Sequence, residues 1–164
     1  ALPISLDRRD VDLLVFDFDG VLTDNRVLVF SDGTEAVWCT RADGLAFDAF
    51  RRHAVRTIIL STEKNAVVAA RAAKLQVQAI TGCGDKAAAI ETLCVELGLQ
   101  PERVVYVGND LNDLAAMRKV GTAIAVADAH PRIREIARHT LTARGGEGAA
   151  REMAAHVFGL DMGE

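Results

Sequence analysis

The chain has 164 residues, of which 50% are hydrophobic and 26% charged, and its formal net charge at pH 7 is −4. This length predicts a single domain over residues 1–164 with a substantial buried core, and the net charge argues against nucleic acid or an anionic membrane as a partner. No apolar run reaches transmembrane length, the first residues lack the plan of a signal peptide, and the three cysteines lack metal-site spacing, so we expect free thiols in a cytoplasmic protein.

The stretch from Val15 to Asp24 begins as a buried strand and then delivers two acids, Asp17 and Asp19. In an open α/β sheet, ligands bind at the carboxyl ends of the strands. Two carboxylates this close repel each other, and their burial is costly unless a cation compensates them. Mg²⁺ suits the position because it prefers oxygen ligands. An acidic surface turn is the alternative explanation of the same residues.

Residues 26–39 are expected to form a β-hairpin, with turn residues at Ser31-Asp32-Gly33 between two apolar runs. An isolated hairpin is only marginally stable, so Trp38 and its apolar neighbours need a surface to pack on. The parent domain and a partner subunit can both provide one. We favour the partner subunit.

Short apolar runs alternate with helical patterns through the rest of the chain. Strands are expected at 55–60, 77–80, 103–107, 122–126 and 140–142, and helices at 45–50, 64–75, 86–97, 111–120 and 131–138. A Gly-rich, flexible segment at 144–148 should lead into a last helix. This alternation predicts an α/β fold with a doubly wound parallel sheet, Rossmann-like and three-layered.

Right-handed crossovers place the carboxyl ends of all parallel strands at one edge of the sheet. That edge should carry Asp17, Asp19, Ser61 and Asp110, each of which follows an apolar strand. Lys86 lies in the first turn of a predicted helix, where a positive charge opposes the helix dipole. A role at the same sheet edge explains this lysine better than helix stability does.

This set of residues is suited to phosphoryl transfer. Asp17 would be the nucleophile, and Asp19 would protonate the leaving alkoxide and then activate water. Ser61 and Lys86 would bind the non-bridging phosphate oxygens.

A Mg²⁺ ion at this edge would be held by the carboxylates of Asp17 and Asp110 and by a backbone carbonyl at Asp19. Asn109 and Asp113 would orient the metal's water ligands and the lysine. The four histidines show no spacing typical of a metal site, and we expect them at the surface or in packing roles.

The same residues, in the same order, resemble the four motifs of the haloacid dehalogenase superfamily of phosphatases. The motifs are Asp17-Phe18-Asp19-Gly20-Val21 with Thr23, then Ser61, then Lys86, and finally Gly108-Asn109-Asp110 with Asp113. The short chain is similar to the cap-less branch, which hydrolyses phosphorylated 2-keto-3-deoxy sugar acids. This resemblance implies a protruding hairpin, no cap domain, and a homotetramer whose 26–39 hairpins meet at the centre, where a neighbouring subunit takes the place of the cap.

Within this branch, two details resemble the 2-keto-3-deoxynononate 9-phosphate (sialic-acid-type) phosphatases. One is Ser61-Thr62-Glu63-Lys64 followed by Arg71 and Lys74, and the other is Glu147 in the C-terminal tail 144–164. The resemblance implies substrate contacts by Glu63, Arg71, Lys74 and Glu147. The alternative substrate is 3-deoxy-manno-octulosonate 8-phosphate, a lipopolysaccharide precursor.

One residue departs from the family pattern, because Asn109 stands where an acid is common, and weaker Mg²⁺ binding is therefore expected. Two functions of other classes compete with a phosphatase, namely a phosphoacceptor receiver-type domain and a non-catalytic tetramerisation module. The Asp-x-Asp spacing disfavours the receiver, because Asp19 lies where it would assist hydrolysis of the aspartyl-phosphate. The retained Asp17, Asp19, Lys86 and Asp110 favour an active enzyme over the silent module.

Overall fold

Strand β1 (Leu13–Phe16) lies at the middle of the sheet, where its four apolar side chains are fully buried. It pairs in parallel with β4 (Thr57–Leu60) on one side and with β6 (Val104–Gly108) on the other. The computed structural model describes residues 4–163, and its six-stranded parallel sheet has the order β5-β4-β1-β6-β7-β8. The outer strands are β5 (Gln78–Ile80), β7 (Thr122–Ala125) and β8 (His139–Thr140).

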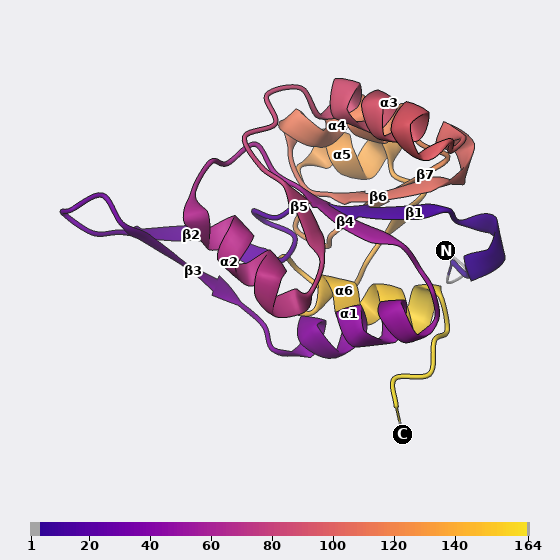
Figure 1. Ribbon diagram of the computed structural model, residues 1–164, viewed down its shortest axis with the longest axis horizontal. Helices are drawn as coiled ribbons and strands as arrows, with labels where there is room; N and C mark the ends of the chain where they lie inside the picture. Colours follow the sequence, from indigo (N-terminus) through magenta and orange to yellow (C-terminus); the bar gives the residue numbers. More distant parts are fainter. Residues whose placement is uncertain (1–3, 164) are drawn as a thin grey trace.

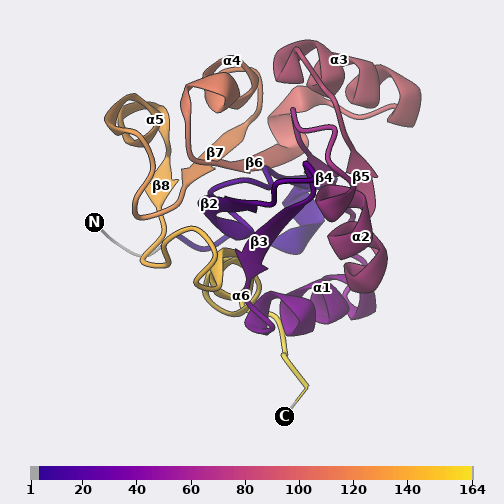
Figure 2. The ribbon, with the colours of Figure 1, turned by 90° about the vertical axis from the view of Figure 1, so that its left-hand side faces the viewer.

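Helices cover both faces of this sheet, so the predicted three-layer α/β fold is confirmed (Figures 1 and 2). One face carries α1 (Ala42–Arg52), α2 (Ala66–Leu75) and α6 (Ala149–Glu152), and the other carries α3 (Lys86–Leu97), α4 (Leu114–Met117) and α5 (Pro131–Ile136). Aromatic packing ties the first face to β1, because the ring of Phe16 lies 5.5 Å from Phe47 and 6.0 Å from Phe50 between centroids. None of the helices in the described part is long and apolar enough to cross a membrane.

The remaining helical segments are single turns. They are the 3-10 turns η1 (Arg8–Asp10), η2 (Pro101–Arg103) and η3 (Leu111–Asp113) and a π-type turn, η4 (Met153–Val157). The continuous helix expected over 111–120 is therefore wrong, since η3 is followed only by the short α4. The Asp113 carboxylate accepts hydrogen bonds from the backbone N–H groups of Asn109 and Asp110, which tightens the first turn.

The expected hairpin is present and projects from the body of the molecule (Figure 1). It consists of β2 (Thr23–Val29) and β3 (Glu35–Cys39), so it begins at Thr23 rather than at residue 26. The earlier start follows from pairing of Thr23 with Cys39 at the hairpin base. Its apolar residues are open to solvent, with Val29 60% and Trp38 71% exposed. Between residues 4 and 163 no cap domain follows this hairpin.

The Gly-rich segment 144–148, which we name the glycine strap, is tightly packed rather than a flexible link. The backbone N–H of Gly146 donates to Val21 O at 3.0 Å. A Cβ atom on Gly145 would lie 2.2 Å from Gly20 O, which is backbone and cannot move aside easily. The strap therefore lies directly against the loop that follows Asp19, and its glycines allow this close approach.

A buried acid on α1 anchors the helix that follows the strap. The Gly148 N-cap of α6 has no side chain, and Asp43 Oδ1 instead accepts the Arg151 N–H at 3.1 Å. The other carboxylate oxygen of Asp43 is buried and has no hydrogen-bond partner among residues 4–163. Burial raises the pKa of Asp43 to about 6, and the hydrogen bond from the Arg151 N–H opposes this rise.

We expect Asp43→Asn to remove a pH-dependent loss of stability. The pKa of Asp43 is higher in the folded protein than in the unfolded chain, so its contribution is complete below pH 4 and is lost as the pH rises through about 6. Between pH 4.5 and 7.5 the free energy of unfolding of the native protein should fall by about 2 kcal/mol relative to the variant, out of about 3 kcal/mol for the complete titration. Urea denaturation between pH 4.5 and 7.5 measures the difference.

The matched control for this experiment is Asp48→Asn, which changes an exposed acid on the same helix. Asp43→Asn should change the pH dependence of the free energy of unfolding more than this control does, because Asp48 is exposed. A difference between the native protein and Asp43→Asn that stayed constant with pH would contradict the assignment.

Candidate active site

The carboxyl ends of neighbouring strands bring the expected polar residues to one edge of the sheet. Asp17 follows β1, Ser61 follows β4, and Asn109 and Asp110 follow β6. A cavity of about 320 Å³ opens at this edge, and Asp17, Asp19, Asn109 and Asp110 contribute to its wall. The apolar strands position these side chains, because each strand is fixed by core packing up to its last residue.

Lys86 is buried between two carboxylates at the floor of the site. Its ammonium lies 2.7 Å from Asp17 Oδ1 and 2.7 Å from Asp113 Oδ1, and all three side chains are at most 4% exposed. Asp85 caps α3 by accepting the Ala88 N–H at 3.0 Å, and this cap places Lys86 at the first position of the helix. The position that is unfavourable for the helix dipole is therefore one that brings the ammonium to the nucleophile candidate.

Asp113 is held by donors on every side. Tyr106 Oη–H and Lys86 donate to its Oδ1, both at 2.7 Å, and the Asn109 N–H donates to Oδ2 at 2.9 Å. Burial, with the charges of Asp113 and Asp17, raises the pKa of Tyr106 far above its usual value, so the phenol remains a donor. Asp113 is thus a fixed acceptor that orients the lysine.

The site carries more negative than positive charge, because two buried carboxylates share one ammonium. Burial, and next the charge of Asp113, raises the pKa of Asp17 to about 8 even though Lys86 opposes the change. Burial alone would lower the pKa of Lys86, but Asp17 and Asp113 outweigh it and raise this pKa. A cation bound beside Asp17 would compensate the excess charge.

The donor atoms at this position fit a magnesium ion. The Asp17 contacts to Lys86 and to the Phe18 N–H both involve Oδ1, which leaves Oδ2 available. Asp110 is exposed and lines the same cavity, and Asn109 Oδ1 is buried with no hydrogen-bond partner in the described part of the chain. Among residues 4–163 no three His, Cys, Asp or Glu side chains converge on one point. Carboxylate and carbonyl oxygens are the ligands that Mg²⁺ prefers, so Asp17 and Asp110 would hold the ion and Asn109 would add a polar oxygen nearby.

Asp19 is half-buried beside the cavity. Burial and the neighbouring charges of Glu63 and Glu35 raise its pKa, and Lys86 opposes them. The following turn is fixed by Thr23, whose Oγ1 accepts the Gly20 N–H at 3.1 Å. Gly20 has φ +81°, and a Cβ there would lie 1.9 Å from Asn109 Nδ2, so glycine is required for both conformation and space. A carboxyl group with a raised pKa at this position is suited to donating a proton.

The other predicted residues lie in different surroundings. Ser61 is buried, and its Oγ accepts the Glu63 N–H at 3.1 Å, while Glu63 itself lines the cavity. Arg71 and Lys74 line a separate cavity between α1 and α2, and Glu147 is exposed on the glycine strap. The fold therefore brings Glu63 to the cavity, and the substrate contacts of all four residues stay predictions.

Two residues at or near the site, Tyr106 and Glu35, had no sequence signal that we used. Tyr106 lies in the apolar run of β6, although its hydroxyl donates to Asp113. Glu35 lies on β3 and is brought close to Asp19 by the base of the hairpin. Only the tertiary path of the hairpin reveals this second residue.

The chain matches the family model for haloacid dehalogenase-like hydrolases over residues 51–153. The 3-deoxy-D-manno-octulosonate 8-phosphate phosphatase of Escherichia coli K12 is 34% identical to it over 156 residues, which cover 92% of this chain and 83% of that protein. The enzyme of the same name from Yersinia pestis is 35% identical over 153 residues, covering 88% and 78% of the two chains.

Solved structures are similar over the same range. One from Streptomyces avermitilis, ascribed to the HAD family of hydrolases, has a TM-score of 0.91 and 47% identity and covers 96% of each chain. The octulosonate 8-phosphate phosphatase of Moraxella catarrhalis has a TM-score of 0.85 and 32% identity, covering 90% of this chain and 85% of that one. That structure is a complex with a magnesium ion, a phosphate ion and a KDO molecule.

Replacing either of the two carboxylates that contact Lys86 with a carboxamide should change the stability of the protein, and the two changes should have opposite signs. Asp17→Asn removes the cost of burying a carboxyl group whose pKa is raised, and should raise the free energy of unfolding in metal-free buffer at pH 7.5. In Asp113→Asn, the amide N–H₂ replaces one carboxylate oxygen and faces at least two hydrogen-bond donors. This change should lower the free energy of unfolding by about 3 kcal/mol or more. Urea denaturation in the presence of EDTA measures both. Equal losses in the two variants would contradict an uncompensated charge at Asp17.

Proposed function

The chain belongs to the haloacid dehalogenase-like hydrolases, and we propose that it is a Mg²⁺-dependent phosphatase of phosphorylated 2-keto-3-deoxy sugar acids. The observation that carries this proposal is the buried contact between Lys86 and Asp17, with Asp19 beside it at the cavity. The named relatives favour 3-deoxy-D-manno-octulosonate 8-phosphate as the substrate over the nononate 9-phosphate suggested by Glu63 and Glu147. The nononate ester is kept as the second candidate.

In the proposed first step, one carboxylate oxygen of Asp17 attacks the phosphorus atom and the bond from phosphorus to the sugar oxygen breaks. Asp19 gives its proton to the departing alkoxide, so that a neutral alcohol leaves and an aspartyl-phosphate remains. The raised pKa of Asp19 keeps more of it protonated for this step. Lys86 stays charged and neutralises the phosphate oxygens.

In the second step, the Asp19 carboxylate takes a proton from a water molecule as that water attacks the phosphorus atom. The bond from phosphorus to Asp17 breaks, which releases inorganic phosphate and restores both carboxyl groups to their starting states. Asp17 and Asp110 would hold the magnesium ion, which, when bound, polarises the phosphate and compensates its charge. Support for this metal comes from the charge excess at the site and from the magnesium complex of the Moraxella catarrhalis relative.

We also propose that the protein is a cytoplasmic homotetramer assembled through its hairpins. The hairpin exposes a row of large apolar side chains, Val27, Leu28, Val29, Phe30 and Trp38, each at least 50% open to solvent. An exposed apolar patch of this kind is typical of a contact with another protein surface. Cys39, Cys83 and Cys94 are free thiols, which is in keeping with a reducing compartment.

Phosphate release from three esters tests the activity. We expect the highest kcat/KM with octulosonate 8-phosphate, ahead of nononate 9-phosphate and acetylneuraminate 9-phosphate, and loss of turnover with EDTA. Asp17→Asn should lower kcat by about a thousandfold or more, and Asp19→Ala by about 100- to 10,000-fold.

The same assay separates the other classes of function. A persistent phosphoprotein without turnover would support a receiver-type domain. Release of phosphate from none of the esters would support a tetramerisation module without activity.

Light scattering tests the assembly. Val29→Asp places a charge on the exposed hairpin and should reduce the particle mass from that of four chains toward that of one. The matched control is Val95→Asp, because Val95 is 81% exposed on α3, far from the hairpin in sequence. A native protein with the mass of one chain, or a tetramer that survives Val29→Asp, would reject the proposed interface.

A further inference from the structure

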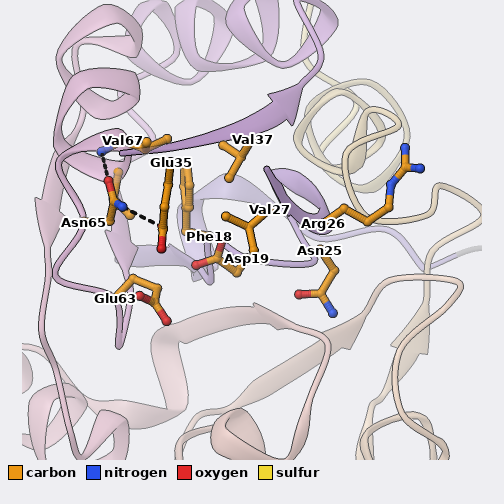
Figure 3. A pocket seen from close by; sticks show the side chains of 11 residues that line it. Phe18, Asp19, Asn25, Arg26, Val27, Glu35, Val37, Glu63, Asn65 and Val67 are labelled. Atoms are coloured by element: carbon orange, nitrogen blue, oxygen red, sulfur yellow. Dashed lines mark hydrogen bonds between the residues drawn. The ribbon is translucent and has the colours of Figure 1, made fainter. Parts of the chain in front are cut away.

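A second cavity, which we name the hairpin groove, extends the site toward the hairpin. It has a volume of about 200 Å³ and lies between the base of the hairpin and the start of α2 (Figure 3). Asp19, Asn25 and Glu63 line both this groove and the cavity at Asp17. An alcohol whose phosphate lies at Asp17 would therefore extend into the groove.

Glu35 is held in the groove by a helix cap. Its Oε2 accepts a hydrogen bond from Asn65 Nδ2 at 2.6 Å. Asn65 is the N-cap of α2, and its Oδ1 accepts the Val67 N–H at 3.0 Å. Because the helix uses the amide oxygen, the amide N–H₂ has to face Glu35. The orientation of Glu35 is thus fixed before any ligand arrives, and Figure 3 shows its carboxylate pointing into the groove beside Asp19.

The chemistry of the groove matches a chain of hydroxyl groups. Neither Glu35 nor Glu63 forms an ion pair within residues 4–163, and together with Asp19 they present acceptor oxygens to one space. A carboxylate accepts hydrogen bonds from hydroxyls and repels another anion. Apolar side chains, among them Val27 and Val37, also line the groove and suit the C–H groups of the same chain. Arg26 lines it too, but its guanidinium is paired with Asp24.

We propose that Glu35, oriented by Asn65, determines specificity by accepting hydrogen bonds from the hydroxyl groups next to the phosphate ester of the substrate. The carboxylate of the sugar acid then lies outside the groove, away from Glu35 and Glu63. This inference rests on the proposed phosphatase function and deepens it, because it names the part of the alcohol that the hairpin recognises.

Kinetics on two esters test the role of Glu35. With octulosonate 8-phosphate, Glu35→Ala should lower kcat/KM about 10- to 100-fold, mainly through KM, because a hydrogen bond to a charged acceptor is lost. With p-nitrophenyl phosphate, which has no hydroxyls, kcat/KM should change less than about threefold. Glu35→Gln keeps an acceptor oxygen, so its kcat/KM with octulosonate 8-phosphate should lie between those of the native protein and the alanine variant.

Two further variants sharpen the test. Asn65→Asp keeps a helix cap but replaces the donor to Glu35 with a second carboxylate, so it should reproduce the selective loss without unfolding α2. Glu96→Ala changes an exposed acid on α3 and should leave kcat/KM unchanged with both esters. Light scattering on each variant should give the native mass, so that a change in assembly is not mistaken for a change in recognition.

The outcomes separate this inference from the proposed function. Equal losses of Glu35→Ala on both esters, or no loss on either, would overturn the role of Glu35 alone. A native protein that hydrolysed p-nitrophenyl phosphate without preferring any sugar acid phosphate would reject the proposed substrate, and release from neither would reject both proposals. A preference for glucosamine 6-phosphate over glucose 6-phosphate that Glu35→Ala abolished would assign the groove to an ammonium group instead of hydroxyls.

Discussion

The ammonium of Lys86 is the point on which the arrangement of the site depends. It joins the first residue after β1 to Asp113 in the turn after β6, and it comes from the first turn of α3. Burying three charged groups is expensive, and the cost is offset only when their geometry is kept. The two sheet strands and the helix are therefore held in register by the same contact that places Asp17 for chemistry. The excess negative charge that remains makes the folded site less stable than its apolar surroundings, and it also favours cation binding.

Residues that directly follow a strand could be assigned to the site from the sequence alone. Asp17, Ser61 and Asp110 each follow an apolar run, and the parallel topology brings them to one edge. Lys86 was identified because it violates a local preference, and such violations often mark functional positions. The three-layer fold follows from the alternation of strands and helices along the chain, and the family follows from the resemblance of the four motifs.

Features that depend on contacts between distant segments of the chain could not be predicted from the sequence. The strap 144–148 was expected to be flexible because glycine is common in mobile links, but its glycines allow approach to the backbone of Gly20. The continuous helix expected over 111–120 was wrong because the sequence pattern does not reveal the contact between Asp113 and Lys86. Asp43 and Glu35 are ordinary surface acids by sequence, and only folding places one against α6 and the other beside Asp19. No period or motif encodes such pairings.

The packing of the glycine strap on the loop after Asp19 has a consequence for the order in which the protein is made. During synthesis β1 leaves the ribosome before its pairing partners β4 and β6. The loop from Gly20 to Asp24 acquires its full set of neighbours only when residues 145 and 146 have emerged. The loop that follows the nucleophile candidate is thus synthesised well before the residues that complete its surroundings. Reactive geometry is assembled late, when nearly the entire sheet is already in place.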